Sequence, residues 1–244
     1  MLFNQWKKYF VGSVLFLVTT TGHTEDLNEQ LDCILEPNTK VELSTPVYGV
    51  LSDVLVQRGN RVKKDQVVAT LTSGVEKAAV ELARARMEFG QRRATRNEEL
   101  YREKLISIHE KDEIDTEILI AKLQLQQAEE QLKLRKVVSP IDGFVVEREK
   151  DAGEYVEQEA FLTVVNLDPL YAEVIAPARY IDHIKEGMSA EVKLTGSTSE
   201  VHIATVSLVD QIVDAASGTI RVRLSLENPE SLIPSGLKCL VSFN

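Results

Sequence analysis

The pattern of apolar and polar positions divides the chain after residue 45 into three kinds of segment. Short apolar runs separated by turn residues fill 46–71 and 138–166, a pattern typical of β-strands joined by tight turns. Between them, residues 72–137 lack proline and place apolar residues at helical spacing. From 167 to 244 strand-like apolar runs return, at 170–175, 190–194, 202–209, 219–226 and 237–243. The pattern therefore predicts a mainly β protein that carries one helical insertion.

The two β segments before residue 167 are two copies of one motif. Residues 46–71 align without a gap on residues 140–165, and both copies open with Pro-x-x-Gly, which predicts a turn. Because a single copy cannot bury its apolar face alone, we expect the two copies to close on each other. Two unrelated hairpins that share only turn residues are the alternative. The identities are Pro46 with Pro140, Gly49 with Gly143, Gly59 with Gly153 and Val62 with Val156, and the prolines and glycines among them are the expected turn residues.

The segment 72–137 predicts an antiparallel coiled-coil hairpin. Apolar residues recur every seven positions, with alanine three places later, which predicts one seam on each of two helices. A break is expected near residues 105–107, where Ser107 can cap the second helix and Glu110 occupies the capping-box position. Arms of about 28–30 residues would be about 42–45 Å long, so the tip would lie far from any core and is interpreted as a docking device. The predicted seam residues are Val75, Ala78, Leu82, Ala85 and Phe89, followed by Ile118, Ala121, Leu125, Ala128 and Leu132.

The first 24 residues read as a signal peptide. Lys7 and Lys8 precede an apolar run at 9–18, and small and polar residues follow it. An uncleaved N-terminal membrane anchor is the alternative. The formal net charge of −10 and the absence of a basic patch argue against a nucleic-acid partner.

The repeat and its insertion together resemble a known family. The two copies are similar to the halves of a lipoyl/biotinyl domain, and 138–143, VSPIDG, resembles the signature that opens the second half. Their separation by a helical hairpin resembles the membrane fusion proteins, the periplasmic adaptors of RND-type efflux and haemolysin-secretion-D-like export systems. The resemblance implies a leading strand in 25–45, a lipoyl-like domain from 46–71 and 138–166, a hairpin in 72–137 and a small β-barrel in 167–244. It extends to 232–237, LIPSGL, which is similar to the end of the adaptor barrel.

The resemblance also implies partners and a docking site. Such adaptors form homo-oligomeric rings in the periplasm against an inner-membrane transporter, here expected to be RND-type, and reach an outer-membrane channel of the TolC class. The channel-docking pattern of the family matches Arg96, Leu100 and Ser107 at the predicted tip. Each of the three also has a purely structural explanation, as a solvated helix residue, a seam residue and an N-cap. We expect a short form that lacks most of the membrane-proximal domain, and an adaptor of type I secretion or ion export is the alternative.

Cys33 and Cys239, in the leading strand and the last predicted strand, are the only cysteines. In the family these two regions pass close to each other, so a disulfide is possible, and two separate buried thiols are the alternative.

The sequence contains few residues that would support an enzymatic or a carrier function. The four histidines are scattered, and no P-loop, G-x-S-x-G or C-x-x-C is present. We expect no cofactor, no metal and no catalytic residue. A swinging-arm carrier would need a modified lysine on a turn between the two halves, but Lys77 is followed by helical sequence, and Lys63 and Lys64 belong to an earlier turn.

Overall fold

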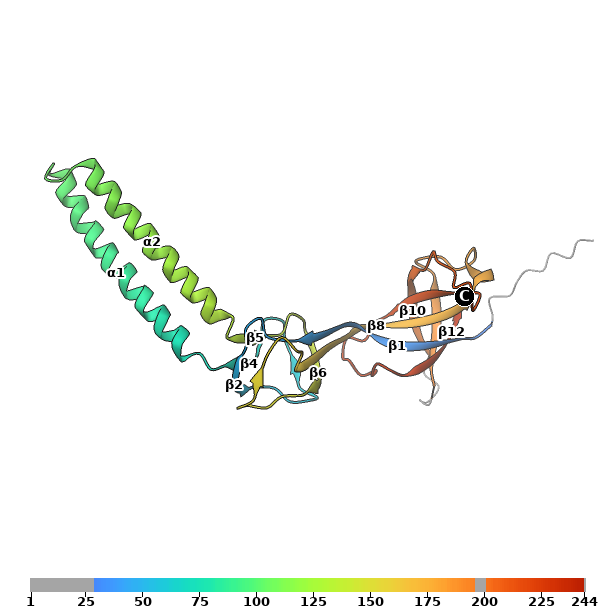
Figure 1. Ribbon diagram of the computed structural model, residues 1–244. Coiled ribbons are helices and arrows are strands. Elements are labelled where there is room, and N and C mark those ends of the chain that lie inside the picture. Colours follow the sequence, from blue (N-terminus) through green and yellow to red (C-terminus); the bar gives the residue numbers. More distant parts are fainter. Residues whose placement is uncertain (1–28, 196–200, 244) are drawn as a thin grey trace, which may run out of the picture.

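The computed structural model describes residues 29–195 and 201–243, so the predicted signal peptide lies outside the described residues. Figure 1 shows an elongated molecule: a helical hairpin at one end, a small β domain in the middle and a β-barrel at the other end. The hairpin consists of α1 (Gly74–Arg102) and α2 (Ile108–Lys133). The protein is thus mostly β with two long helices, as the pattern predicts.

The middle domain is built from the two copies of the repeat, and each copy pairs with the other. The first copy forms β2 (Gly49–Val54), β3 (Arg61–Val62) and β4 (Val67–Leu71). The second forms β6 (Gly143–Arg148), β7 (Tyr155–Val156) and the start of β8 (Leu162–Pro177), and β5 (Lys136–Val138) precedes it. Strand β2 pairs with β7, and β6 pairs with β3, so Gly49 faces Val156 just as Gly143 faces Val62.

Hydrogen bonds repeat the same two-fold relation. The Gly59 N–H donates to the Val145 carbonyl at 2.8 Å, and the Gly153 N–H donates to the Leu51 carbonyl at 2.8 Å. Just before each copy, a buried hydroxyl donates to the carbonyl two residues on, Thr45 to Val47 and Ser139 to Ile141. Because equivalent atoms bond in both halves, the domain closes as two interlocked copies around one core. The buried core residues from both copies and their flanks are Leu43, Leu51, Val56, Val62, Val68, Ala69, Leu71, Val137, Val145, Val156, Phe161, Leu162 and Val164.

The turn that opens each copy is shorter than predicted. Pro46 and Pro140 are exposed and lie in bends of the chain ahead of β2 and β6, so both prolines are turn residues as expected. Gly49 and Gly143 are not turn residues, and the prediction is wrong for these two. Each is the first residue of a strand, because the pairing with the other copy already begins there.

The repeated glycines serve two different needs. Gly59 and Gly153 have φ of 88° and 93°, a conformation that residues with a Cβ rarely adopt. Gly143 is needed for space instead, because a Cβ there would lie 2.1 Å from the carbonyl oxygen of residue 165 on β8. At Gly49 a Cβ would meet the Arg135 Nη1 at 2.9 Å, which is the end of a flexible side chain.

Two long strands connect the middle domain to the barrel. Strand β1 (Leu31–Leu43) pairs with β8 along most of its length, from Cys33 opposite Val174 to Leu43 opposite Leu162, with an irregularity between Pro37 and Thr39. Strand β8 therefore passes without a break through residue 166, where the second half of the repeat was expected to end.

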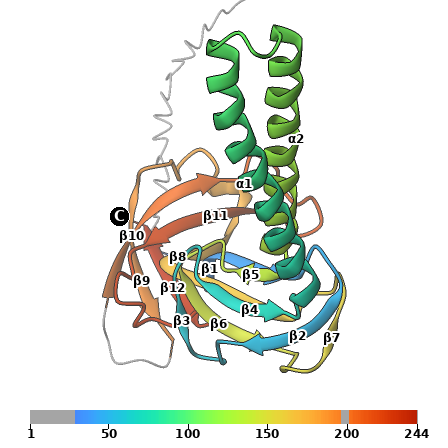
Figure 2. The ribbon, with the colours of Figure 1, turned by 90° about the vertical axis from the view of Figure 1, so that its left-hand side faces the viewer.

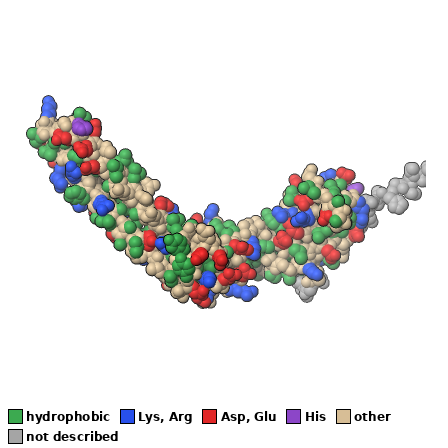
Figure 3. Space-filling model, viewed as in Figure 1, with side chains coloured by type: hydrophobic (Ala, Val, Ile, Leu, Met, Phe, Trp, Pro, Cys, Tyr) green, Lys and Arg blue, Asp and Glu red, His purple; other side chains and the backbone are tan. Residues whose placement is uncertain are grey.

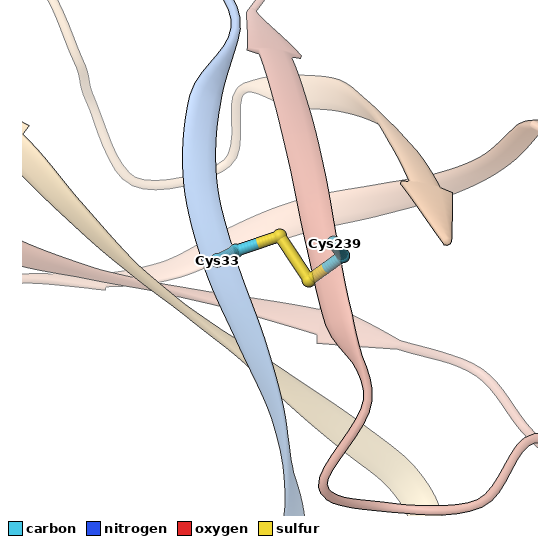
Figure 4. Close-up of a disulfide and its surroundings, with 2 residues drawn as sticks. All are labelled: Cys33 and Cys239. Atoms are coloured by element: carbon cyan, nitrogen blue, oxygen red, sulfur yellow. A yellow bond between two sulfur atoms is a disulfide. The ribbon is translucent and has the colours of Figure 1, made fainter. Parts of the chain in front are cut away.

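The barrel is closed by the first and last strands. Strands β9 (Ser189–Leu194), β10 (Val201–Val209), β11 (Thr219–Leu226) and β12 (Lys238–Phe243) complete it. The pairing runs β1-β12-β9-β10-β11-β8 and returns to β1. In the structure Cys33 on β1 and Cys239 on β12 are directly opposite and form a disulfide, with 4.8 Å between their Cα atoms (Figure 4). The covalent bond thus lies at the seam where the barrel closes.

Candidate functional site: the helical hairpin

The two helices lie side by side and antiparallel in both ribbon views (Figures 1 and 2). The inner face of α2 contains the five residues predicted for it, with Ala128 buried and Leu125 and Leu132 packed against the cluster formed by Val80 and Ala83 of α1. The seam of α2 is therefore the predicted one.

The seam predicted for α1 is wrong. Val75, Leu82 and Phe89 are 80%, 56% and 59% exposed, and Ala78 and Ala85 are exposed as well. The residues that face α2 form a neighbouring stripe whose spacing alternates between four and three, and only two of them, Val80 and Ala83, are buried. The full inner stripe is Glu76, Val80, Ala83, Met87, Gly90, Ala94, Asn97 and Tyr101.

A set of hydrogen bonds at the root of the hairpin involves the first residue of this inner stripe. The Arg135 guanidinium donates to the Glu76 Oε1 from Nε at 3.0 Å and from Nη2 at 2.7 Å, and Nη1 donates to the Tyr48 carbonyl at 3.1 Å. The Leu71 N–H donates to the Arg135 carbonyl at 2.8 Å. Glu76 thereby faces α2, so the contact at the root lies on the same side of α1 as the inner stripe.

Ion pairs between the helices define which residues share a height along the hairpin. Arg84 contacts Glu129 at 3.4 Å, Arg93 contacts Glu117 at 2.7 Å, and Lys111 contacts Glu98 at 2.9 Å. Helix α1 continues through Gly90, between the first two pairs, and a Cβ there would meet the Ile118 side chain at 3.4 Å. Because such exposed pairs contribute little energy each, they mark the register of the two helices rather than determine it.

A capping box builds the turn at the tip. The Ser107 Oγ accepts from the Glu110 N–H at 3.2 Å, and the Ser107 N–H donates to the Glu110 carboxylate at 2.8 Å. Lys104 has a φ of 61°, which lets the chain reverse within the short turn. Ser107 is therefore an N-cap, which is one of the two roles considered for it.

The docking residues expected from the sequence lie on the last turns of α1 and at the start of α2. Arg96 is exposed, and among the described residues it has no hydrogen bond or ion pair within the chain. Leu100 is 37% exposed. Two further apolar residues that sequence reasoning missed, Leu105 and Ile108, are 65% and 55% exposed at the same tip. The signal that could have found them is an apolar run inside a short polar turn.

Charges around the tip are held in place by their neighbours. The ammonium of Lys111 hydrogen-bonds to Glu98 and lowers the pKa of that carboxyl. Glu98 and Asp115 in turn raise the pKa of Lys111 to about 12. The Ser107 N–H lowers the pKa of Glu110. Lys111, Glu98 and Glu110 therefore stay charged at neutral pH, and the tip presents both signs of charge around an apolar centre, part of which is visible in Figure 3.

The lysines considered for a carrier role are not on a turn between the halves. Lys77 lies within α1, and Lys63 and Lys64 lie between β3 and β4 in the first copy. Within residues 29–195 and 201–243, no three His, Cys, Asp or Glu side chains gather as metal ligands. No helix of the same ranges is long and apolar enough to cross a membrane.

Comparison with known proteins identifies the class of each β domain. Residues 39–166 match the family described as CzcB-like, barrel-sandwich hybrid domain, and 169–244 match the CusB-like, beta-barrel domain. The multidrug resistance protein MexA of Pseudomonas aeruginosa is 22% identical over 237 residues, which cover 91% of this chain and 62% of MexA. The toluene efflux pump periplasmic linker protein TtgA of Pseudomonas putida is 24% identical over 216 residues, 80% of this chain and 55% of TtgA.

Solved structures share the fold. A MacA-MexA chimera that contains the MexA α-hairpin domain of P. aeruginosa gives a TM-score of 0.78 at 21% identity, over 88% of this chain and 81% of the chimera. MacA of Actinobacillus actinomycetemcomitans gives 0.69 at 19% identity, over 88% and 78%. The barrel-sandwich match covers more than half of the sequence, and the chain therefore belongs to the membrane fusion protein family, which includes the periplasmic linkers of efflux pumps. It spans about half to two thirds of the length of the curated relatives it matches.

Proposed function

We propose that this chain is a periplasmic adaptor of a tripartite efflux pump, which links an inner-membrane transporter of the RND type to an outer-membrane channel of the TolC class. The observation that carries the proposal is the exposed apolar tip of a long hairpin, far from both cores of the molecule (Figure 1). Membership of a family that includes efflux-pump linkers supports the adaptor role. The proposal includes a coiled-coil geometry for the hairpin and a periplasmic ring of several copies.

In this proposal the tip docks to the channel through two kinds of contact. Leu100, Leu105 and Ile108 offer apolar side chains that gain about 25 cal/mol per Å² when a partner covers them. Arg96 can donate several hydrogen bonds to carboxylates or carbonyls of the channel because its guanidinium is not occupied within the described chain. The capping box keeps Ser107 and the start of α2 fixed while the contact forms.

Site-specific crosslinking at the tip tests this function. His109→Cys, at an exposed position beside the cap, is added to the protein with its native disulfide intact, and intact cells are treated with a thiol-reactive crosslinker. We expect a covalent adduct with the outer-membrane channel that Arg96→Asp reduces at least tenfold. Arg86→Asp, which makes the same charge change on an exposed residue lower on α1, should leave the adduct unchanged. Exported, folded protein without an adduct would remove the channel from the proposal.

A further inference from the structure

A pocket lies at the edge of the middle domain, where the first copy of the repeat meets the second. Strands β2 and β7 run side by side there, and Val50 of β2 pairs with Tyr155 of β7 (Figure 2). The pocket has a volume of about 480 Å³, within the range of about 300–1,000 Å³ that is typical of sites for small molecules. Tyr48 and Tyr155 are 73% and 52% exposed beside it. Its lining residues are Pro46, Tyr48, Tyr155, Glu157, Gln158 and Glu159.

The polar groups of this pocket have no partners within the described chain. Over residues 29–195 and 201–243, no hydrogen bond or ion pair engages its two carboxylates or its two phenol hydroxyls. Among the described residues, no lysine or arginine lines the pocket. Arg135 donates to the Tyr48 carbonyl, but the charge of its guanidinium is matched by Glu76. The pocket therefore presents aromatic rings together with negative charge that no lining side chain balances.

The repeat contains a second place with the same strand pairing and a different set of side chains. In the alignment of the two copies, Tyr155 corresponds to Arg61, and Val50 corresponds to Phe144. Arg61 and Phe144 are opposite each other, as Tyr155 and Val50 are, and the Arg61 guanidinium lies 5.7 Å from the centre of the Phe144 ring. At the second place the chain thus supplies both an aromatic ring and a cation. The other positions equivalent to the pocket lining hold Pro140, Asp142, Lys63, Lys64 and Asp65.

The two places show which side chains the fold requires. The same strand pairing forms at the second place without tyrosine or glutamate, so the tyrosines and glutamates of the pocket are not needed to close the domain. A cation held over an aromatic ring is favourable, and more so where the cation is partly removed from water. The pocket has the rings and the negative charge for such a contact, and the cation has to come from outside the described chain.

We propose that this pocket binds an organic cation with an aromatic, apolar body. The rings of Tyr48 and Tyr155 contact the body and the charge of the ligand, and Glu157 and Glu159 balance that charge. Binding needs no partner protein, so it is independent of docking at the hairpin tip. In an efflux pump the pocket would bring a cationic cargo into direct contact with the adaptor.

Titration calorimetry of the purified protein with tetraphenylphosphonium tests this site. We expect saturable binding, and a separate titration with tetraphenylborate, an anion of the same shape, should show no binding at the pocket. Tyr155→Ala should weaken the binding of the cation about tenfold, because a ring that faces the charge is lost. Glu157→Gln with Glu159→Gln should weaken it about threefold and remove most of its dependence on salt, since exposed charges interact weakly and are screened.

The second place provides the matched control. Asp65→Asn with Asp142→Asn makes the same change of charge on the two carboxylates there, and the affinity for tetraphenylphosphonium should stay the same. Circular dichroism checks that each variant is folded, which is expected because both tyrosines are exposed.

Three results would overturn the proposal: no saturable binding to the folded protein, unchanged affinity in Tyr155→Ala, or equally tight binding of tetraphenylborate that Tyr155→Ala removes. Self-association is the fourth, measured by sedimentation velocity. If Glu157→Gln with Glu159→Gln abolished self-association while the native protein bound no tetraphenylphosphonium, the pocket would hold a basic side chain of a second copy instead of a small molecule.

Discussion

At the scale of single residues, the two repeat glycines with short contacts should respond differently to the same methyl group. Gly143→Ala places a Cβ against a backbone carbonyl, which cannot move without shifting β8, so we expect the free energy of unfolding to fall by at least about 2 kcal/mol. Gly49→Ala meets mainly the end of the Arg135 side chain, and we expect a smaller loss. Urea unfolding followed by circular dichroism measures both, and equal losses would contradict the assignment.

A structural feature could be predicted from the sequence when the residues that cause it are close together in the chain. The repeat predicted the turns at Gly59 and Gly153 and the pairing of the halves, because turn geometry and matched spacing are local. The capping box at Ser107 was predicted for the same reason. The contact between Glu76 and Arg135, 59 positions apart, has no local signal. The sequence also left open whether the two cysteines pair, because barrel closure sets their distance.

At the scale of elements, the same reasoning explains why one helix of the hairpin was predicted correctly and the other was not. Helix α2 has its most apolar seven-residue repeat on the inner face. Helix α1 has its most apolar repeat outside, and its inner face includes the polar or small residues Glu76, Gly90 and Asn97. Periodicity alone ranks stripes by hydrophobicity, so it cannot show which stripe of a helix packs against the other helix of the same chain.

The hydrogen bonds of Arg135 at the hairpin root are expected to limit the range of directions that the hairpin adopts relative to the middle domain. Arg135→Ala removes three hydrogen bonds and leaves the half-buried Glu76 carboxylate without its partner, a loss of about 1–3 kcal/mol at the root. We expect the protein to fold with a wider range of hairpin directions. Distances between spin labels at Gln126→Cys and Thr205→Cys, measured by pulsed electron paramagnetic resonance, should broaden.

Arg84→Ala is the matched control for that experiment. It removes an exposed ion pair in the middle of the hairpin, where the neighbouring seam contacts remain, so the distance distribution should keep its width. A distribution that stays equally narrow in Arg135→Ala would show that the strands alone fix the hairpin.

At the scale of the whole molecule, the disulfide closes a loop that contains most of the chain. Cys33 and Cys239 are separated by 206 residues, and a crosslink over so long a loop removes much of the conformational freedom of the unfolded chain. Replacing both by serine should lower the free energy of unfolding by about 2–5 kcal/mol. Urea titrations of the oxidised and reduced proteins measure the same quantity, and coincident curves would contradict the prediction.

The continuous pairing of β1 with β8 has a mechanical consequence. Between the barrel and the middle domain the load of a pull along the molecule passes through two covalent backbones, β1 and β8, rather than through a non-covalent interface. The hairpin is attached in the same way, by the chain segments that continue from β4 and lead into β5. A pull from the tip to the barrel therefore loads two backbone connections at once between these domains, and the junction resists extension without a separate domain interface.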